Sequence, residues 1–171
     1  MKALIVFYSR TGVTRAAAQR LAEELRSAGA EAAVEEILDT KDRRGIAGWF
    51  GGGKDATLKR ATTIEPVKAD VGSFDVVVVG TPVWAWTATP AARAFLTQHG
   101  AACRAVAFFC TMGGSGDKGA FSAMKDLCGK APVATLALLD RKVKGGDDDK
   151  YLAPVREFAR SITDAAGTQR K

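Results

Sequence analysis

The chain has 171 residues, of which 47% are hydrophobic and 26% charged, a composition typical of a soluble globular protein of one domain. Its 25 basic and 19 acidic residues give a formal charge of +6, but no nucleic-acid module and no aromatic-basic repeat accompany this excess, so nucleic-acid binding is not expected. The chain contains no apolar run near the roughly 20 residues of a membrane span, and the run at 3–7 is too short for a signal peptide, so we expect a cytoplasmic protein.

Five short apolar runs alternate with helical patterns along the chain. The runs predict strands at residues 3–7, 31–37, 75–79, 105–109 and 133–139, and several are almost continuously apolar, as expected for parallel strands covered on both faces. Amphipathic patterns predict helices at residues 14–28, 90–98, 117–128 and 151–166. Thr89 and Pro90 are expected to begin the second helix, and Gly29 and Gly129 to stop the first and third. This alternation predicts a doubly wound α/β sheet with right-handed crossovers, built as a single domain over residues 1–171.

The three cysteines do not form a recognisable motif. Cys103, Cys110 and Cys128 lie far apart, no CxxC occurs, and the single histidine, His99, completes no zinc-ligand set, so no metal site is expected. We interpret the cysteines as free, buried or half-buried thiols in a reducing compartment. For Cys110, which lies beside a candidate binding loop, packing is favoured over a redox role.

The loop after the first predicted strand has the composition of a phosphate site. Ligands of such sheets bind beyond the carboxyl ends of the strands, which makes the loops that follow the strands the candidates. In residues 8–15, Ser9, Thr11 and Thr14 supply hydroxyls, Gly12 supplies flexibility, and the helix start supplies N–H groups that favour an anion. The motif is neither a Walker loop nor GxGxxG. The loop therefore predicts phosphate binding, with a Ser/Thr-rich helix cap as the alternative.

Two further loops combine aromatic residues and glycines. Residues 80–90 contain Trp84 and Trp86, and a flat aromatic ligand would use one of them, preferably Trp84, as a stacking surface; the alternative is that both fill the space between loop and helix. Residues 110–117 contain three glycines, which let the backbone approach a ligand closely or only form a turn capped by Ser115 or Asp117. Together the loops predict a phosphate on the first and a planar ring between the other two.

These motifs resemble those of the flavodoxin-like superfamily over essentially the whole chain. Residues 9–14, Ser-Arg-Thr-Gly-Val-Thr, resemble the family's FMN phosphate loop, Ser/Thr-x-Thr-Gly-x-Thr. Residues 80–84 resemble the GTPVW loop of a bacterial and archaeal branch, and residues 109–114 resemble that branch's third loop. The resemblance implies a five-stranded parallel sheet in the order 2-1-3-4-5 with helices on both faces, and FMN as the cofactor.

By position, the resemblance also implies how each loop would hold FMN. The phosphate would lie against Ser9, Arg10, Thr11, Gly12, Val13 and Thr14, with Arg10 and Val13 acting through their amides. One ring edge would follow Pro82, Val83, Trp84, Ala85, Trp86 and Thr87, with Trp84 on a ring face. The other edge would lie along Thr111, Met112, Gly113, Gly114 and Gly116. Well-studied flavodoxins are acidic around the flavin, whereas this chain is basic.

Two functions are consistent with such a site. The first is an electron carrier that docks on redox partner proteins. The alternative is a small FMN-dependent oxidoreductase that takes hydride from NAD(P)H and passes electrons to a quinone or a similar acceptor. The loops hold no Cys/His pair, Ser/His/Asp set or paired carboxylates, so no catalytic acid or base is assigned. The carrier is favoured because the chain is small and nothing in it resembles a nicotinamide site. Protoporphyrinogen oxidation, a third option, has no dedicated residue support.

One connection is longer than usual for a compact domain. Residues 39–73 carry no strong strand pattern, and the glycine-rich stretch 45–53 is not expected to be regular, although a helix could lie around 55–60. We predict that Trp49 and Phe50 fold over the flavin or a subunit interface, which leaves a homo-oligomer open. Nearby basic residues would recruit an acidic redox partner; they are Lys41, Arg43, Arg44, Lys54, Lys59 and Arg60.

Overall fold

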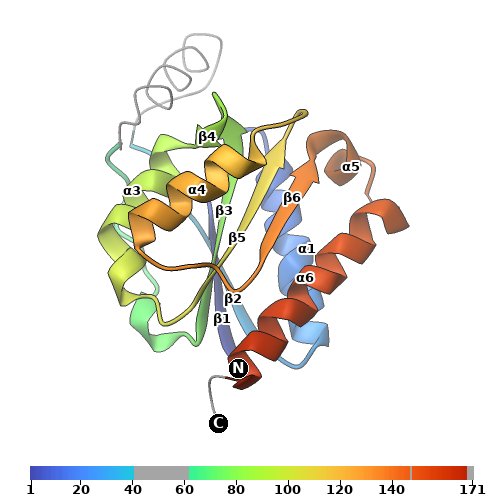
Figure 1. Ribbon diagram of the computed structural model, residues 1–171, viewed down its shortest axis with the longest axis horizontal. Coiled ribbons are helices and arrows are strands. Elements are labelled where there is room, and N and C mark those ends of the chain that lie inside the picture. The colour runs from blue at the N-terminus through green and yellow to red at the C-terminus, as the bar shows by residue number, and fades with distance from the viewer. Residues whose placement is uncertain (41–61, 147, 169–171) are drawn as a thin grey trace.

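Strands and helices alternate along the chain in the computed structural model, which describes residues 1–40, 62–146 and 148–168 (Figure 1). The strands are β1 (Lys2–Phe7), β2 (Glu31–Glu36), β3 (Val76–Trp84), β4 (Thr87–Ala88), β5 (Val106–Met112) and β6 (Thr135–Leu139). The α-helices are α1 (Val13–Ser27), α3 (Pro90–His99), α4 (Asp117–Cys128), α5 (Asp140–Lys144) and α6 (Asp149–Thr168). Two short 3-10 turns, η1 (Val71–Ser73) and η2 (Gly100–Ala102), complete the described elements.

The main strands form a parallel sheet in the order β2-β1-β3-β5-β6. Numbered along the chain without the short β4, this order is the predicted 2-1-3-4-5, so the predicted fold is confirmed. From β1, the chain adds β2 on one side, and it then adds β3, β5 and β6 in turn on the other side. The direction in which strands are added to the sheet therefore reverses between β1 and β3. In doubly wound sheets, this switch in strand order is where ligands bind, at the carboxyl edge.

Side chains alternate between two apolar cores, one on each face of the sheet. Ile5 and Val78 belong to the core shared with α1, α5 and α6, whereas Val6 and Val77 belong to the core shared with α3 and α4. Figure 1 shows the same division, with α3 and α4 on one side of the strands and α1 and α6 on the other. Because β1 and β3 are buried on both faces, their nearly continuous apolar runs are explained.

The predicted helix boundaries agree with the structure to within two residues. Thr89 is the N-cap of α3, where its hydroxyl accepts the Ala92 N–H at 3.5 Å, and Pro90 is the first helical residue. Gly129 ends α4 in the left-handed conformation, with φ +67°. The short helix α5 has no counterpart in the prediction, because its five residues are too few to show a helical period.

The end of β3 differs from the predicted loop. The predicted strand ends at residue 79, but β3 continues to Trp84 because Gly80, Thr81 and Pro82 pair with β5. The strand then turns through Ala85 and Trp86 into β4, which pairs antiparallel with it. The second candidate loop is therefore largely a β-hairpin.

The start of β1 and the end of α6 lie at one end of the sheet, and the turns that follow the strands lie at the other (Figure 1). No described helix is long and apolar enough to cross a membrane. The stretch 45–53, the expected helix near 55–60 and the six basic residues of the long connection fall outside the described residues.

Candidate functional site

Contacts between neighbouring loops join the three predicted segments into one site. The Thr14 and Thr111 hydroxyl oxygens lie 2.8 Å apart, which ties the start of α1 to the end of β5. The Tyr8 N–H donates to the Gly80 carbonyl at 3.1 Å, which ties the first loop to β3. The structure therefore brings the three loops together at the carboxyl edge.

The first loop presents a row of free backbone donors. Gly12 is the N-cap of α1, with φ +88°, and has no side chain with which to cap the helix. The Ser9 hydroxyl, itself buried, accepts the Arg15 N–H at 3.2 Å and so closes the loop. Among the described residues, none accepts a hydrogen bond from the N–H groups of residues 10–14. Unfilled amides at the start of a fifteen-residue helix form a ready site for an anion such as phosphate.

Two arginines near this loop have different roles. The Arg15 guanidinium binds the Glu36 carboxylate through two hydrogen bonds, of 2.9 and 2.8 Å, and this pair raises the pKa of Arg15 above its ordinary value. Its charge is therefore largely satisfied by β2. Arg10 makes no ion pair with the described residues. It is the cation of the loop that remains available to a bound anion.

The two tryptophans of the hairpin have distinct environments. Trp84 is half-buried against the core beneath α3, and its ring meets Tyr8 edge-on, with centroids 5.7 Å apart and an interplanar angle of 88°. Trp86 is 71% exposed, although aromatic side chains of this size gain much from burial. Trp86 therefore offers the freer aromatic face, and Trp84 has a packing contact in addition to any contact with a ligand.

The hairpin turn is conformationally costly. Ala85 and Trp86 have φ values of +47° and +58°, and they form a two-residue turn with both residues left-handed, as in type I′ turns. Such turns normally use Asn and Gly, because a left-handed L-residue costs about 1–2 kcal/mol. At the base of the hairpin, the buried Thr81 and Thr89 hydroxyl oxygens lie 3.0 Å apart. Strain of this kind persists only where surrounding contacts hold it.

The third loop leaves its backbone open. Gly113, Gly114 and Ser115 are exposed, and no heavy atom lies within 4 Å of where a Cβ on either glycine would be. Thr111 and Met112 lie at the end of β5, and Gly116, with φ +113°, precedes α4. The open amides of this loop can therefore reach the polar edge of a ring.

Cys110 lies at this edge as a buried thiol. It is fully buried in β5, and burial raises the pKa of its thiol to about 12. Because the thiolate is the reactive form, the packing role is favoured. All three cysteines are buried and free.

Two residues that support the site, Tyr8 and Gly119, are not predicted from the sequence. For Tyr8 the sequence leaves packing and a place near the flavin as alternatives, and the structure places its buried ring against Trp84. Gly119 in α4 is not among the predicted site residues, yet a Cβ at this position would overlap the Trp86 carbonyl oxygen. A glycine in the first turn of a helix, where alanine is the better helix former, was the available signal.

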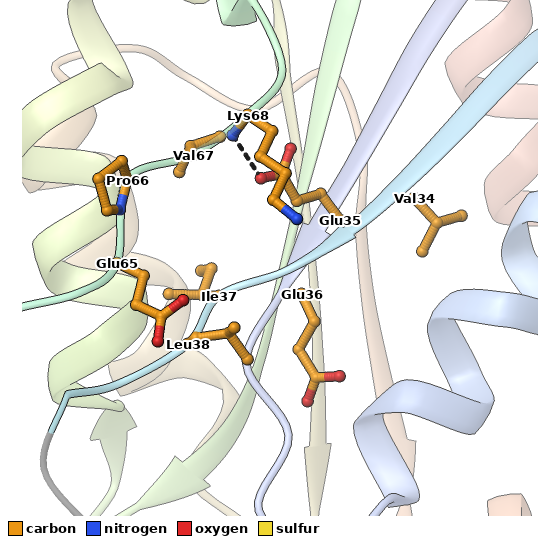
Figure 2. A pocket seen from close by; sticks show the side chains of 9 residues that line it. All are labelled: Val34, Glu35, Glu36, Ile37, Leu38, Glu65, Pro66, Val67 and Lys68. Carbon is orange, nitrogen blue, oxygen red and sulfur yellow. Dashed lines mark hydrogen bonds between the residues drawn. The ribbon is translucent and has the colours of Figure 1, made fainter.

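A separate hollow of about 430 Å³ lies along the opposite side of β2 from β1 (Figure 2). Three carboxylates line it, those of Glu35, Glu36 and Glu65. The Glu35 carboxylate accepts the N–H groups of Lys68 and Ala69 at 2.6 and 3.0 Å, which fixes the returning chain beside the strand. Because the charged side chains of this lining are three glutamates and a single lysine, and because it includes none of the predicted site residues, the hollow does not suit a phosphate.

A family model described as Flavodoxin matches residues 2–152. The chain belongs to the flavodoxin family. No curated protein matches it.

Solved structures of a flavoprotein and of two flavodoxins share the fold at low sequence identity. A flavoprotein from Lactobacillus acidophilus NCFM, crystallised with FMN, is 19% identical, with a TM-score of 0.69 over 86% of this chain and 99% of the other. A flavodoxin from the domain Archaea is 16% identical, with a TM-score of 0.62 over 98% and 99%. The flavodoxin of Streptococcus pneumoniae TIGR4 is 16% identical, with a TM-score of 0.63 over 96% and 99%.

Proposed function

We propose that this flavodoxin-family protein binds FMN at the carboxyl edge of its sheet and carries electrons between redox partner proteins. The observation that carries the proposal is the row of unpartnered N–H groups at residues 10–14, which faces no acceptor among the described residues. An exposed tryptophan and an open glycine loop border the same edge. The relative from Lactobacillus acidophilus was crystallised with FMN, which supports the choice of ligand.

The first loop would hold the phosphate mainly through its backbone. The amides of residues 10–14 would donate to the phosphate oxygens, the exposed Thr11 hydroxyl would add a side-chain donor, and Arg10 would add positive charge. The buried Thr14 hydroxyl would fix the helix start through Thr111, and Ser9 would fix the loop through the Arg15 N–H. This arrangement binds an anion without a lysine.

The other two segments would hold the ring. Pro82 to Thr87 would follow one ring edge, with Trp84 or Trp86 against a ring face, and Thr111 to Gly116 would follow the other edge. The motif at residues 80–84 supports placing the chain in the GTPVW branch of the family. When bound, FMN supplies the capacity to accept and donate one or two electrons, and the protein controls access to it.

The carrier function is preferred because the chain is small and nothing in its sequence resembles a nicotinamide site. We propose that residues 1–171 form one domain with this function. An acidic redox partner fits the net charge of +6, and the cytoplasm is the proposed compartment. The exposed Trp86 borders the proposed ring site, so a partner protein could approach the ring from this side.

Absorbance spectroscopy of the purified protein tests FMN binding. We expect a flavin spectrum, and mass spectrometry of the released ligand should identify FMN; protein isolated without ligand should recover the spectrum when titrated with FMN. Failure to bind added FMN would refute the proposal. A steady-state assay then separates the two functions: electron transfer that requires an added reductase supports the carrier, whereas rapid NAD(P)H oxidation with a quinone alone supports the oxidoreductase.

A further inference from the structure

The turn at Ala85 and Trp86 combines two unfavourable features at one point. Both residues are left-handed without being glycine, and the large indole of Trp86 is 71% exposed. Neither feature helps the chain to fold, because glycine or asparagine would form the same turn with less strain. Backbone strain that persists in a structure indicates a functional constraint when neighbouring contacts hold it in place.

Two glycines of the next segment hold this turn. A Cβ on Gly116 would lie 2.6 Å from the Val83 Cγ1 atom, 3.1 Å from the Trp86 Cα atom and 3.3 Å from its Cδ1 atom. A Cβ on Gly119 would overlap the Trp86 carbonyl oxygen. The backbone of the turn therefore rests directly on the first turn of α4, and the indole lies beside the third loop. Gly119 is itself exposed, so the close approach is made to the turn and not to the core.

We propose that Gly119 is a positioning residue for the flavin ring site. Its missing side chain lets the Trp86 carbonyl rest on α4, and this contact holds the left-handed turn so that the indole stands beside the third loop as a face for the ring. Gly119 acts through Trp86 and contacts no ligand. This inference rests on the proposed function, because it assumes that the ring bound beside the turn is the flavin of FMN.

Measurement of the FMN dissociation constant for Gly119→Ala tests the proposal. In α4 alone, alanine is the better helix former, so the helix itself is not weakened by the change. We expect FMN binding to weaken by about 10-fold, the scale of one lost aromatic contact. Gly167→Ala in α6 is the matched control, because a Cβ there meets no atom within 4 Å, and it should bind FMN as the wild type does.

A double-mutant cycle with Trp86→Ala separates positioning from a general structural effect. If Gly119 acts through the indole, Trp86→Ala should weaken FMN binding by a similar factor, and adding Gly119→Ala should cause little further loss. Multiplicative losses in the double variant would overturn the proposal, as would wild-type affinity in either single variant. Because Trp86 is exposed, its alanine variant is expected to fold even if Gly119→Ala does not.

The wild-type titration keeps this inference distinct from the proposed function. Wild-type protein that binds FMN, together with unaffected variants, refutes the role of Gly119 and leaves the cofactor assignment intact. Wild-type protein that binds no FMN refutes both. Quenching of flavin fluorescence provides a second signal, because displacement of the indole should leave the bound flavin brighter in Gly119→Ala than in the wild type.

Discussion

Individual residues at the first loop contribute in different ways. Backbone N–H groups of residues 10–14 supply most of the donors. The left-handed Gly12 and the start of α1 are sufficient to align these groups. Ser9 and Thr14 are buried and occupied by internal hydrogen bonds, whereas Thr11 is exposed. Substitution of Thr11 therefore tests a ligand contact with little effect on the fold.

Thr11→Ala should weaken FMN binding by about 1–3 kcal/mol, because one charge-assisted hydrogen bond to the phosphate is lost. Isothermal titration calorimetry would measure the change. Riboflavin, which has no phosphate, should bind the variant and the wild type equally well. Thr163→Ala on α6 is the control, since it removes a threonine hydroxyl that donates to the Arg160 carbonyl of its own helix and lies outside the proposed site. Equal FMN affinity of Thr11→Ala and the wild type would contradict the assignment of the phosphate.

Cys110 links residue burial to the pH dependence of stability. Burial raises the pKa of its thiol from 9.0 to about 12, so the folded chain keeps the proton at pH values where the unfolded chain loses it. The stabilising contribution is complete below pH 9 and is lost as the pH rises toward 12. In urea denaturation between pH 8 and 11, the free energy of unfolding should decrease less steeply for Cys110→Ala than for the wild type. Identical slopes would show that this thiol does not titrate differently in the two states.

At the scale of elements, the β3–β4 hairpin and helix α4 form a unit. The pairing of β3 with β5 ends at Pro82. Beyond it, the turn of the hairpin rests on Gly116 and Gly119, and the base is fixed by Thr81 and Thr89. The conformation of the turn is thus set by its neighbours and not by its own residues. Two changes within this unit have opposite expected effects on stability.

Ala85→Asn should stabilise the protein without FMN by about 0.5–1 kcal/mol, because asparagine tolerates the left-handed conformation that alanine adopts here at a cost. Urea denaturation of the ligand-free variant measures this gain. Ala153→Asn, at an exposed position of α6 with an ordinary helical backbone, should give no gain. A less stable Ala85→Asn variant would show that the turn is not strained.

Gly80→Ala should destabilise the protein by about 1–3 kcal/mol or more, the usual cost of overpacking a core. Gly80 of β3 lies opposite Phe109 of β5, and a Cβ at this position would overlap the Phe109 ring. The double variant Gly80→Ala with Phe109→Leu should recover part of the loss, because the smaller side chain makes room. Thermal unfolding of Gly80→Ala, of Phe109→Leu and of the double variant would measure this coupling, and a Gly80→Ala protein as stable as the wild type would exclude the close contact.

For the molecule as a whole, the formal charge of +6 governs encounter with charged partners. Bound FMN would remove about two charges through its phosphate, which leaves the complex positive. Oxidation of the reduced FMN-loaded protein by ferricyanide should therefore slow as ionic strength rises, whereas oxidation by hexaammineruthenium(III) should accelerate. Stopped-flow absorbance would measure both rates. The opposite pair of trends would show that the charge near the flavin differs in sign from the net charge.

The sequence predicts much of the global fold because the relevant signals are local. Alternating apolar runs, Thr89-Pro90 and Gly129 determine the strands and helix ends, and parallel strands with short turns leave few possible orders. The first loop is predicted at the carboxyl edge of the sheet because it joins the end of the first strand to the first helix. The hairpin could not be predicted, since neither Ala85 nor Trp86 favours a left-handed turn and Pro82 argues against a continued strand. Likewise, the role of Gly119 depends on contact between distant elements, which no local pattern records.

The polarity of the sheet determines how the protein should be attached to a surface. The start of β1 lies at the end of the sheet opposite the three loops (Figure 1). A linker at Met1 would therefore hold the molecule with the proposed flavin edge facing solution, where a soluble partner can reach it but an electrode cannot. Anchoring through a cysteine introduced at Lys118, an exposed residue beside that edge, would reverse the molecule and bring the flavin edge toward the electrode. The same chain could thus exchange electrons with soluble partners in one orientation and with the electrode in the other.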